Sequence, residues 1–352
     1  MVDWTSSMQQ TFEYYTVDPN TWKDVKLIDT VTSCTITRES DSETRGSATF
    51  DIAESIGECY VRAYLITIQN GVKEKHPLGT FLVQSPSSSF DGKVKAVTLD
   101  AYTPLLELKE KQPPIGYYVP KTANVMENAY RLTRENVRAP ISEPKCDTTL
   151  FHDFVADTDD TWLTFLIELI NNAKYYFDLD EMGRILFSPK QDTASLQPVW
   201  EFDDDNSSIL YPEFSMDHDL FGIPNVVEVI YSNGEVCYDI VVTNDDPNSP
   251  ISTVNRGRKV VYRETNPSSI GDPTENRIKE YAKQLLRDLS TIEYTVTYTH
   301  GYCPVRVGDC VRLNYVRAGM KNTKAKIISQ SIKCEPGCPV TEKAVITTKL
   351  WG

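Results

Sequence analysis

Short runs in which apolar and polar residues alternate constrain this chain most, because they recur near both ends of the sequence. The first part of the chain contains VTSCTIT, SATFDI and KAVTLDAY, and the last third contains TIEYTVTYTH and TEKAVITTKLW. A period of two is typical of strands that bury one face of a sheet. Short strands separated by turns about every 8–12 residues predict a small barrel or sandwich at each end of the chain.

Two dipeptides predict tight turns between strands of the first part. Asn70–Gly71 and Asp91–Gly92 are typical of two-residue hairpin loops, in which both residues adopt positive φ. The run YVRAYLITIQ, which ends just before Asn70, is mostly apolar. It predicts a strand that is buried on both faces.

Three helices are predicted from apolar residues spaced three and four positions apart. The first covers residues 124–135 with Asn124 as its N-cap, the second covers 160–174 with Thr158, Asp159 or Asp160 as its cap, and the third covers 273–289 with Thr274 as its cap. A hairpin that turns at residues 180–183 follows the second helix. The stretch 245–257, DDPNSPISTVNRG, is interpreted as an exposed loop.

This order of elements predicts a β-rich α+β fold. We expect a first β domain at 1–112, a small α/β insert at 113–206, and a second β domain at 207–352 that contains the helix at about 273–289. The length of 352 residues fits two or three domains of about 100–150 residues each, and 40% hydrophobic residues suffice for their cores.

The charge of the chain is concentrated in its middle. The whole sequence has a net charge of −14, which argues against a nucleic-acid clamp because phosphate binding needs a positive surface. Between Lys145 and Asp219 there are 17 acidic and 4 basic residues, a net of −13, so the remainder has a net of only −1. The densest stretches are Asp157, Asp159 and Asp160, and then Asp203, Asp204 and Asp205. Solvated loop and helix-terminal carboxylates, a negatively charged lumen or cleft, a partner-docking surface and a cation site all remain open.

Neither a membrane span nor an export signal is predicted. No apolar run approaches the roughly 18 residues that a spanning helix needs, and the N-terminus MVDWTSSMQQTFEYYTVD is polar and acidic. We therefore expect folding in a cytoplasm, where the eight cysteines stay reduced. Only Cys334 and Cys338, in KCEPGCPV, have a spacing that suits zinc, and a turn at Gly337 explains the same pattern.

No residue is nominated as catalytic, cofactor-binding or metal-binding. The sequence lacks H-E-x-x-H, G-x-S-x-G, a P-loop and G-x-G-x-x-G. A polar turn is the favoured interpretation of the triplet Asp217–His218–Asp219, with a metal site as its alternative. Cys146 and His152 are neighbours in sequence without forming a triad, and DLDEMG, around Asp180, is better explained as a hairpin turn than as a calcium loop.

Adjacent tyrosines form a further pattern. Tyr14–Tyr15, Tyr117–Tyr118 and Tyr175–Tyr176 place neighbouring rings on opposite faces of a strand. One ring of each pair is therefore a candidate for contact with a partner.

Four stretches resemble the baseplate hub proteins of tailed phages and related contractile injection systems. They are HPLGTFLVQSPSSSFDGKVKAVTLDAYTPLLELK, DDTWLTFLIELINNAKYYFDLDEMGRILFSP, NVVEVIYSNG, and TYTHGYCPVRVGDCVRLNY followed by a closing strand near Leu350–Trp351. Their order and spacing extend the resemblance over essentially the whole chain. The resemblance implies two tube-type β-barrel domains flanking the insert, and a protein without catalytic chemistry.

The resemblance also implies an assembly. Three chains would present six tube-like domains in a ring, and this homotrimer would join the six-fold tail tube, or a distal tail protein, to the central spike. The tape measure protein is a further expected partner, and DNA would pass through the lumen without specific binding. We expect the protein in the virion baseplate, after assembly in the host cytoplasm. The alternatives are a tail-tip cell-wall hydrolase and a glycan-binding adhesin.

Overall fold

The computed structural model describes residues 2–53, 56–90, 95–191, 195–205, 208–217, 222–232, 236–265, 267 and 274–351. Contacts within the chain group it into two units, residues 1–214 with 297–344 and residues 215–296 with 345–352. The first unit takes in the insert together with strands from both ends of the chain, so its limits differ from those of the three expected ranges. The assignment of two tube-type barrels flanking an insert stays a prediction.

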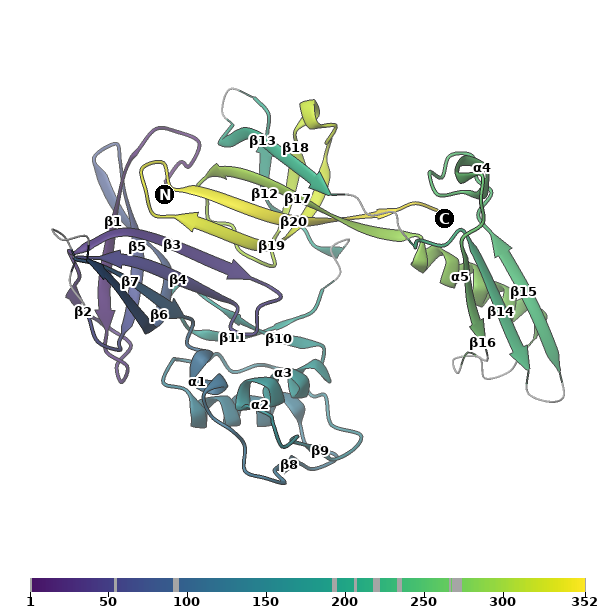
Figure 1. The fold of residues 1–352 in the computed structure, drawn as a ribbon, viewed down its shortest axis with the longest axis horizontal. Helices are drawn as coiled ribbons and strands as arrows, with labels where there is room; N and C mark the ends of the chain where they lie inside the picture. The colour runs from purple at the N-terminus through teal and green to yellow at the C-terminus, as the bar shows by residue number, and fades with distance from the viewer. Residues whose placement is uncertain are drawn as a thin grey trace. The chain divides into compact units, whose positions relative to one another are not determined.

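The fold is β-rich α+β, as the sequence predicts, and the first unit is built on one large sheet (Figure 1). Its N-terminal strands are β1 (Gln9–Val17), β2 (Asp24–Leu27), β3 (Val31–Glu39), β4 (Gly46–Ile52), β5 (Tyr60–Gln69), β6 (Val72–Phe90) and β7 (Lys95–Tyr102). Its later strands are β12 (Pro198–Asp203), β13 (Leu210–Asp217), β17 (Thr291–Gly301), β18 (Cys310–Asn314), β19 (Thr323–Lys333) and β20 (Pro339–Lys349). The order is β13-β17-β20-β19-β3-β4-β7-β6-β5-β1-β2, and β18, paired with β12, joins through β19.

Strand β19 connects the two sets of strands. Residues 323–326 of β19 pair antiparallel with β18, and residues 329–333 pair antiparallel with β3. Its other neighbour in the sheet is β20. One 11-residue strand therefore holds strands from opposite ends of the sequence in a single sheet.

The alternating apolar residues of the sequence lie on the buried face of this sheet. Cys34 and Ile36 of β3 are buried, as are Phe50 of β4 and Val340 of β20, and these side chains share one core. Residues from both ends of the chain therefore fill the same apolar layer.

The turn and the buried strand predicted beside each other are confirmed. Eight consecutive residues of β5 are buried, and Asn70 and Gly71 both have positive φ, 52° and 78°. The turn predicted at Asp91–Gly92 lies outside the described residues.

The helical part of the first unit has its own core. It contains α1 (Leu106–Lys109), β8 (Tyr118–Val119), α2 (Val125–Asn136), β9 (Phe154–Val155), α3 (Trp162–Asn171), β10 (Tyr175–Leu179) and β11 (Ile185–Pro189). Figure 1 shows the three helices grouped next to the β10–β11 hairpin. Asn124 caps α2 as predicted, by accepting from the backbone N–H of Glu127.

The predicted cap of α3 is wrong by one position. Thr161, rather than Thr158, Asp159 or Asp160, is the N-cap, and it forms a capping box with Thr164. Thr161 has extended backbone angles, so its hydroxyl can accept from the N–H of Thr164. Asp160 supports the cap by accepting from the Thr164 hydroxyl at 2.9 Å.

The second unit is a three-stranded sheet covered by one helix. It contains β14 (Val226–Ser232), β15 (Cys237–Thr243), α4 (Thr253–Arg256), β16 (Val261–Thr265) and α5 (Glu275–Leu289), in the strand order β15-β14-β16. Thr274 caps α5 as predicted. Ile278, Ala282 and Leu286 of α5 pack on Val227 and Val229 of β14.

The interpretation of residues 245–257 as an exposed loop is wrong in part. Ile251 and Ser252 are fully buried, and α4 forms within the segment. Buried amides organise it, because Asn225 donates to the carbonyl of Ile251 at 2.9 Å and Asn244 donates to the Ser249 hydroxyl at 2.8 Å. None of the helices described is both long and apolar enough to cross a membrane.

Candidate interaction sites and a buried polar junction

A buried polar chain crosses the sheet of the first unit where β3 meets β19. Arg38 Nη1 donates to Gln330 Oε1 at 3.2 Å, and Gln330 Nε2 donates to Glu342 Oε1 at 2.7 Å. Glu342 also accepts from the Tyr298 hydroxyl at 2.5 Å. Four strands, β3, β19, β20 and β17, are thus joined by side chains inside the core.

His300 lies beside Glu342, at the most buried end of this series of polar side chains. Its Nδ1 lies 2.6 Å from the carbonyl oxygen of Gly301, and its Nε2 lies 3.2 Å from Glu342 Oε1. Among the described residues, Nε2 makes no hydrogen bond, so its contact with Glu342 is one of proximity. His300 and Glu342 are both fully buried, so the pair is sealed from solvent.

At the other end of this series of polar side chains, Arg38 contacts the helical part of the unit. Arg38 Nη2 donates to the Leu78 carbonyl at 2.6 Å, and Nη1 lies 3.7 Å from Glu181 Oε1. Glu181 also lies 2.9 Å from Nε of Arg306. We call the group Arg38, Gln330, Glu342, Tyr298 and His300 the buried junction. Through Arg38 and Glu181, it connects the turn of the β10–β11 hairpin to both sets of strands.

A second buried arginine holds the same hairpin. Arg62, 1% exposed within the apolar run of β5, donates to Asp24 Oδ1 at 2.7 Å and to the Met182 carbonyl at 3.1 Å. Trp22 Nε1 donates to the same carbonyl at 2.7 Å. The turn at 180–183 is confirmed, and its tip is fixed against the N-terminal strands.

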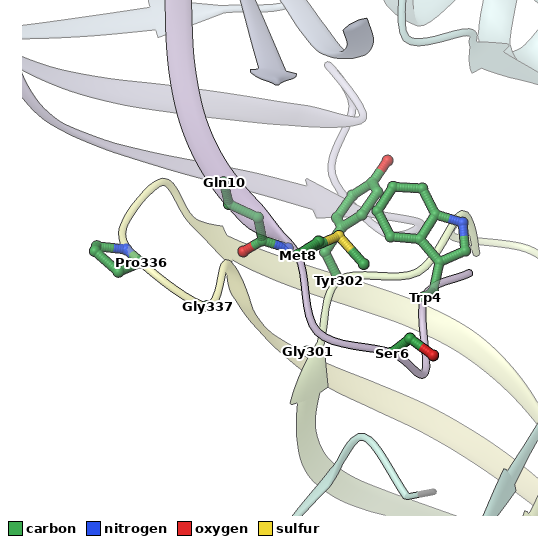
Figure 2. Close-up of a pocket in the computed structure, with 8 residues that line it drawn as sticks. All are labelled: Trp4, Ser6, Met8, Gln10, Gly301, Tyr302, Pro336 and Gly337. Carbon is green, nitrogen blue, oxygen red and sulfur yellow. The ribbon is translucent and has the colours of Figure 1, made fainter. Parts of the chain in front are cut away.

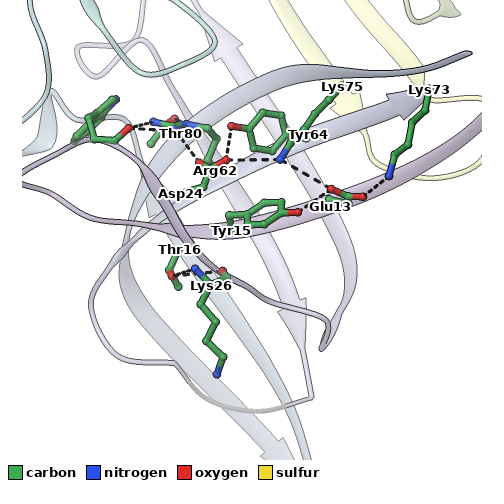
Figure 3. Close-up of polar contacts among 11 residues, drawn as sticks. Glu13, Tyr15, Thr16, Asp24, Lys26, Arg62, Tyr64, Lys73, Lys75 and Thr80 are labelled. Atoms are coloured by element: carbon green, nitrogen blue, oxygen red, sulfur yellow. Dashed lines mark hydrogen bonds and ion pairs between the residues drawn. The ribbon is translucent and has the colours of Figure 1, made fainter. Parts of the chain in front are cut away.

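A cluster of charged and aromatic side chains lies on β1, β2, β5 and β6 (Figure 3). Lys75 Nζ lies 3.9 Å from the ring centroid of Tyr15 and 3.8 Å from that of Tyr64. It also lies 3.9 Å from Glu13 and 3.6 Å from Asp24. Burial and the hydrogen bond to Asp24 raise the pKa of Tyr64 to about 12. This face is organised by its own contacts and presents a mixed charge.

A pocket of about 300 Å³ lies beside the N-terminal segment (Figure 2). Figure 2 shows the side chains of Trp4, Met8 and Tyr302 gathered on one part of its wall, and Pro336 and Gly337 on another. The rings of Trp4 and Tyr302 pack edge to face, with centroids 5.1 Å apart. Its volume is at the lower end of small-molecule sites.

Some carboxylates of the acidic segment are paired within the first unit. Four of them meet arginines from the C-terminal part of the chain: Glu181 with Arg306 at 2.9 Å, Glu201 with Arg312 at 2.5 Å, Asp204 with Arg317 at 2.5 Å, and Asp178 with Arg306 at 3.8 Å. The parallel pairing of β12 with β18 places Glu201 opposite Arg312. Asp203 accepts from Asn314 at 2.7 Å in the same place. These four carboxylates therefore have basic partners that are distant in the sequence.

The other carboxylates and histidines singled out from the sequence lie apart. Asp180 accepts from the N–H of Arg184 within the hairpin turn, and Asp153 accepts from the N–H of Lys121. Cys146 donates to Thr148. His218 and Asp219 lie outside the described residues. Among the residues described, no three His, Cys, Asp or Glu side chains are grouped so as to hold a metal ion.

The structure contains a Cys–His contact that sequence reasoning missed. Cys303 Sγ lies 3.8 Å from His300 Nδ1. Burial raises the pKa of the Cys303 thiol well above its usual value, which opposes thiolate formation. Because both residues are buried, the contact does not provide an accessible nucleophile.

Two of the tyrosine pairs divide as predicted. Tyr14 packs in the core against Phe50, whereas Tyr15 lies in the cluster with Lys75. Tyr117 packs on Trp162, and Tyr118 is exposed.

The buried junction could have been found from a signal in the sequence. Arg38 continues the inward positions of Cys34 and Ile36, and Glu342 lies between the inward Val340 and Ala344. A charged residue at an apolar position of an alternating strand needs a buried partner. Sequence reasoning used the alternation to find strands and did not ask which of its positions were polar.

Comparison with protein families and curated sequences is uninformative about activity. No protein-family model matches the chain. The probable polyketide synthase 2 of Dictyostelium discoideum is 28% identical over 157 residues. That match covers 38% of this chain, and the chain spans about 5% of the length of that relative.

Comparison with solved structures identifies the fold. The tail protein from Neisseria meningitidis MC58 aligns with a TM-score of 0.61 at 13% identity, covering 97% of this chain and 98% of that chain. The 43 kDa tail protein of prophage MuSo2 from Shewanella oneidensis aligns with a TM-score of 0.62 at 12% identity, covering 96% and 98%. A chain of the Francisella PdpA–VgrG complex aligns with a TM-score of 0.55 at 10% identity, covering 97% of this chain and 53% of that chain. The chain therefore has the β-rich α+β fold of phage tail proteins, which confirms at the level of the fold the resemblance that its motifs indicate.

Proposed function

We propose that this chain is a structural baseplate hub of a phage tail. It assembles as a homotrimer whose six barrel-like halves form a pseudo-six-fold ring. The ring joins the tail tube or a distal tail protein to the central spike, contacts the tape measure protein, and lets DNA pass. The observation that carries the proposal is the likeness to two tail proteins over nearly the full length of each chain.

The buried junction supports a structural role, in which the two sets of strands must keep a fixed arrangement. A symmetry adapter must present its two sets of strands at a constant angle, because each subunit contacts two neighbours in a closed ring. Arg38, Gln330 and Glu342 link these sets by hydrogen bonds that water does not reach freely. The hydrogen bonds among Arg38, Gln330 and Glu342 favour one arrangement of the strands, although Nε2 of the neighbouring His300 makes no hydrogen bond among the described residues.

An open sheet edge supports assembly with other chains. Strand β2 is at one end of the strand order, and β1 is its partner in the described sheet. Val25 and Leu27 of β2 are exposed, at 68% and 45%. An apolar edge with free backbone groups pairs readily with another strand. We propose this edge as one of the contacts between subunits.

We propose no catalytic role for the chain. In the acidic segment, Glu181, Glu201 and Asp204 are engaged by Arg306, Arg312 and Arg317. Location in the virion tail, after assembly in the host cytoplasm, belongs to the same proposal. The hydrolase and the adhesin are alternatives that the experiments distinguish.

Light scattering after size-exclusion chromatography tests the oligomer. The purified chain should have about three times the 39.9 kDa mass of one chain, and images of it should show three-fold symmetry. The double substitution Val25→Lys with Leu27→Lys should lower the mass towards that of one chain while the far-UV circular dichroism stays unchanged. Val72→Lys, at an exposed valine of β6, is the matched control and should leave the mass unchanged.

Binding assays test the partners. The chain should co-purify with tail tube and spike proteins expressed in the same cells. A chain that is monomeric at high concentration and binds neither protein would refute the hub. Clearing of cell walls that single Asp→Asn changes abolish would favour the hydrolase, and glycan binding by the isolated chain would favour the adhesin.

A further inference from the structure

Two cysteines face each other where β3 and β19 end their pairing. The N–H of Cys334 donates to the carbonyl of Cys34 at 2.9 Å. This bond continues the register in which Lys333 lies opposite Thr35 and Ile332 lies opposite Ile36. Cα atoms of such hydrogen-bonded antiparallel pairs are about 5.5 Å apart, and their side chains point to the same face. That separation lies within the range that a disulfide bridges.

The surroundings of the two thiols make Cys334 more accessible than Cys34. Cys34 is 3% exposed in the core, and Cys334 is half-buried against the same core. Burial, and then interaction with Cys334, raises the pKa of the Cys34 thiol, and the Tyr14 hydroxyl interacts with both sulfur atoms. Cys334 is therefore the residue that a soluble oxidant reaches first, with Cys34 placed behind it.

We propose that Cys34 and Cys334 are a redox-active pair that forms a disulfide across the β3–β19 pairing. The oxidant is a small-molecule disulfide such as oxidised glutathione. The Cys334 thiolate attacks one glutathione sulfur, and the other glutathione leaves as a thiolate that takes up a proton. The Cys34 thiolate then attacks the Cys334 sulfur and releases the second glutathione. Two thiols are oxidised, and one glutathione disulfide is reduced to two glutathione thiols.

This bond would lock the junction between the two sets of strands. Residues 34 and 334 are 300 positions apart in the sequence, so the bond closes a very long loop of the unfolded chain. Crosslinks that close long loops restrict the unfolded state most. A chain folded under reducing conditions would thus become harder to unfold once its surroundings become oxidising.

Mass spectrometry of the oxidised full-length chain tests the proposal. After incubation with oxidised glutathione and trypsin, without reduction, the peptide 27–38 should be linked to the peptide 334–343. Fragmentation should place the bond on Cys334 rather than on Cys338. The oxidised chain should also unfold at a higher urea concentration than the reduced chain, and dithiothreitol should reverse both changes.

Variants make the test specific. Cys334→Ser, at the more exposed position, should abolish the linked peptide and the shift in the urea midpoint. Cys237→Ser, at the exposed cysteine of β15, should leave both unchanged. The proposal is overturned if the folded wild-type chain keeps all its thiols, stops at a mixed disulfide with glutathione, or forms a Cys334–Cys338 bond instead.

Discussion

The guanidinium of Arg38 in β3 lies 3.2 Å from the side-chain oxygen of Gln330 in β19, and this hydrogen bond joins strands from opposite ends of the sequence. The side-chain amide of Gln330 donates in turn to Glu342, which is fully buried in β20. The pairing of β3 with β19 and the polar chain therefore depend on each other. Loss of one donor leaves acceptors buried without partners.

Replacement of Arg38 should destabilise the first unit strongly. Arg38→Met removes the donors to Gln330 and to the Leu78 carbonyl, so the free energy of unfolding should fall by about 2–4 kcal/mol. Urea denaturation measures the loss. Arg131→Met is the control, because Arg131 makes an exposed i,i+4 pair with Glu135, and it should cost about 0.5 kcal/mol or less. Equal losses in the two variants would contradict a structural role of the junction.

Replacement of Arg62 should release the β10–β11 hairpin. Arg62→Leu removes one donor to Asp24 and one to the Met182 carbonyl, which keep their bonds from Tyr64 and Trp22, and should cost about 1–3 kcal/mol. Trypsin should then cleave faster after Arg184, next to the freed turn. Lys73→Leu, at a 60% exposed lysine paired with Glu13, should cost less than about 1 kcal/mol and leave cleavage unchanged. Unchanged cleavage in Arg62→Leu would show that the tip is held by other contacts.

Alanine substitutions at Gly46 and Gly71 should distinguish the cost of a steric clash from the cost of backbone strain. A Cβ on Gly46, at φ +148°, would lie 2.3 Å from the carbonyl oxygen of Thr37, whereas a Cβ on Gly71, at φ +78°, would meet nothing within 4 Å. Gly71→Ala should cost about 1–2 kcal/mol from strain alone. Gly46→Ala should cost at least about 3 kcal/mol, because β3 must also move. Thermal unfolding of both variants makes the comparison, and a smaller loss in Gly46→Ala would contradict it.

Asp51 should make stability fall in acid. The hydroxyls of Ser33 and Thr98 each donate to Asp51 at 2.6 Å, and they lower the pKa of its carboxyl below the ordinary value of 3.8. A lowered folded-state pKa stabilises the fold above the unfolded value, and this stabilisation is lost as the pH falls through the folded one. Urea midpoints measured from pH 6 to pH 2 should therefore drop less steeply in Asp51→Asn. Parallel curves for the variant and the wild type would argue against this contribution.

Local patterns predicted the local elements well. Alternation identified β3, β4 and β17, and apolar spacing located α2, α3 and α5 to within a few residues. Asn124 and Thr274 were correctly predicted as caps because a cap is satisfied by the N–H groups of the next turn. The cap of α3 was missed because four consecutive residues, 158–161, all have side chains able to accept such a bond.

The pairing of charges could not be read in the same way. The sequence left the role of the acidity between residues 145 and 219 open, because the arginine partners of Glu201 and Asp204 lie more than a hundred residues further along the chain. Parallel pairing of β12 with β18 brings Glu201 to Arg312 across more than a hundred residues. Nothing in the local spacing of either residue indicates the other.

By itself, the sequence determined which segments become strands or helices and which faces are apolar, since both depend on neighbours within a few residues. Only the tertiary structure decided that β19 pairs with β3 as well as with β18, and hence that Arg38, Gln330 and Glu342 meet. Strand register is set by packing between residues that are far apart in the chain, and many partners satisfy the same alternating pattern. The fold selects the register in which Arg38, Gln330 and Glu342 are paired by hydrogen bonds and the apolar faces of the strands are covered.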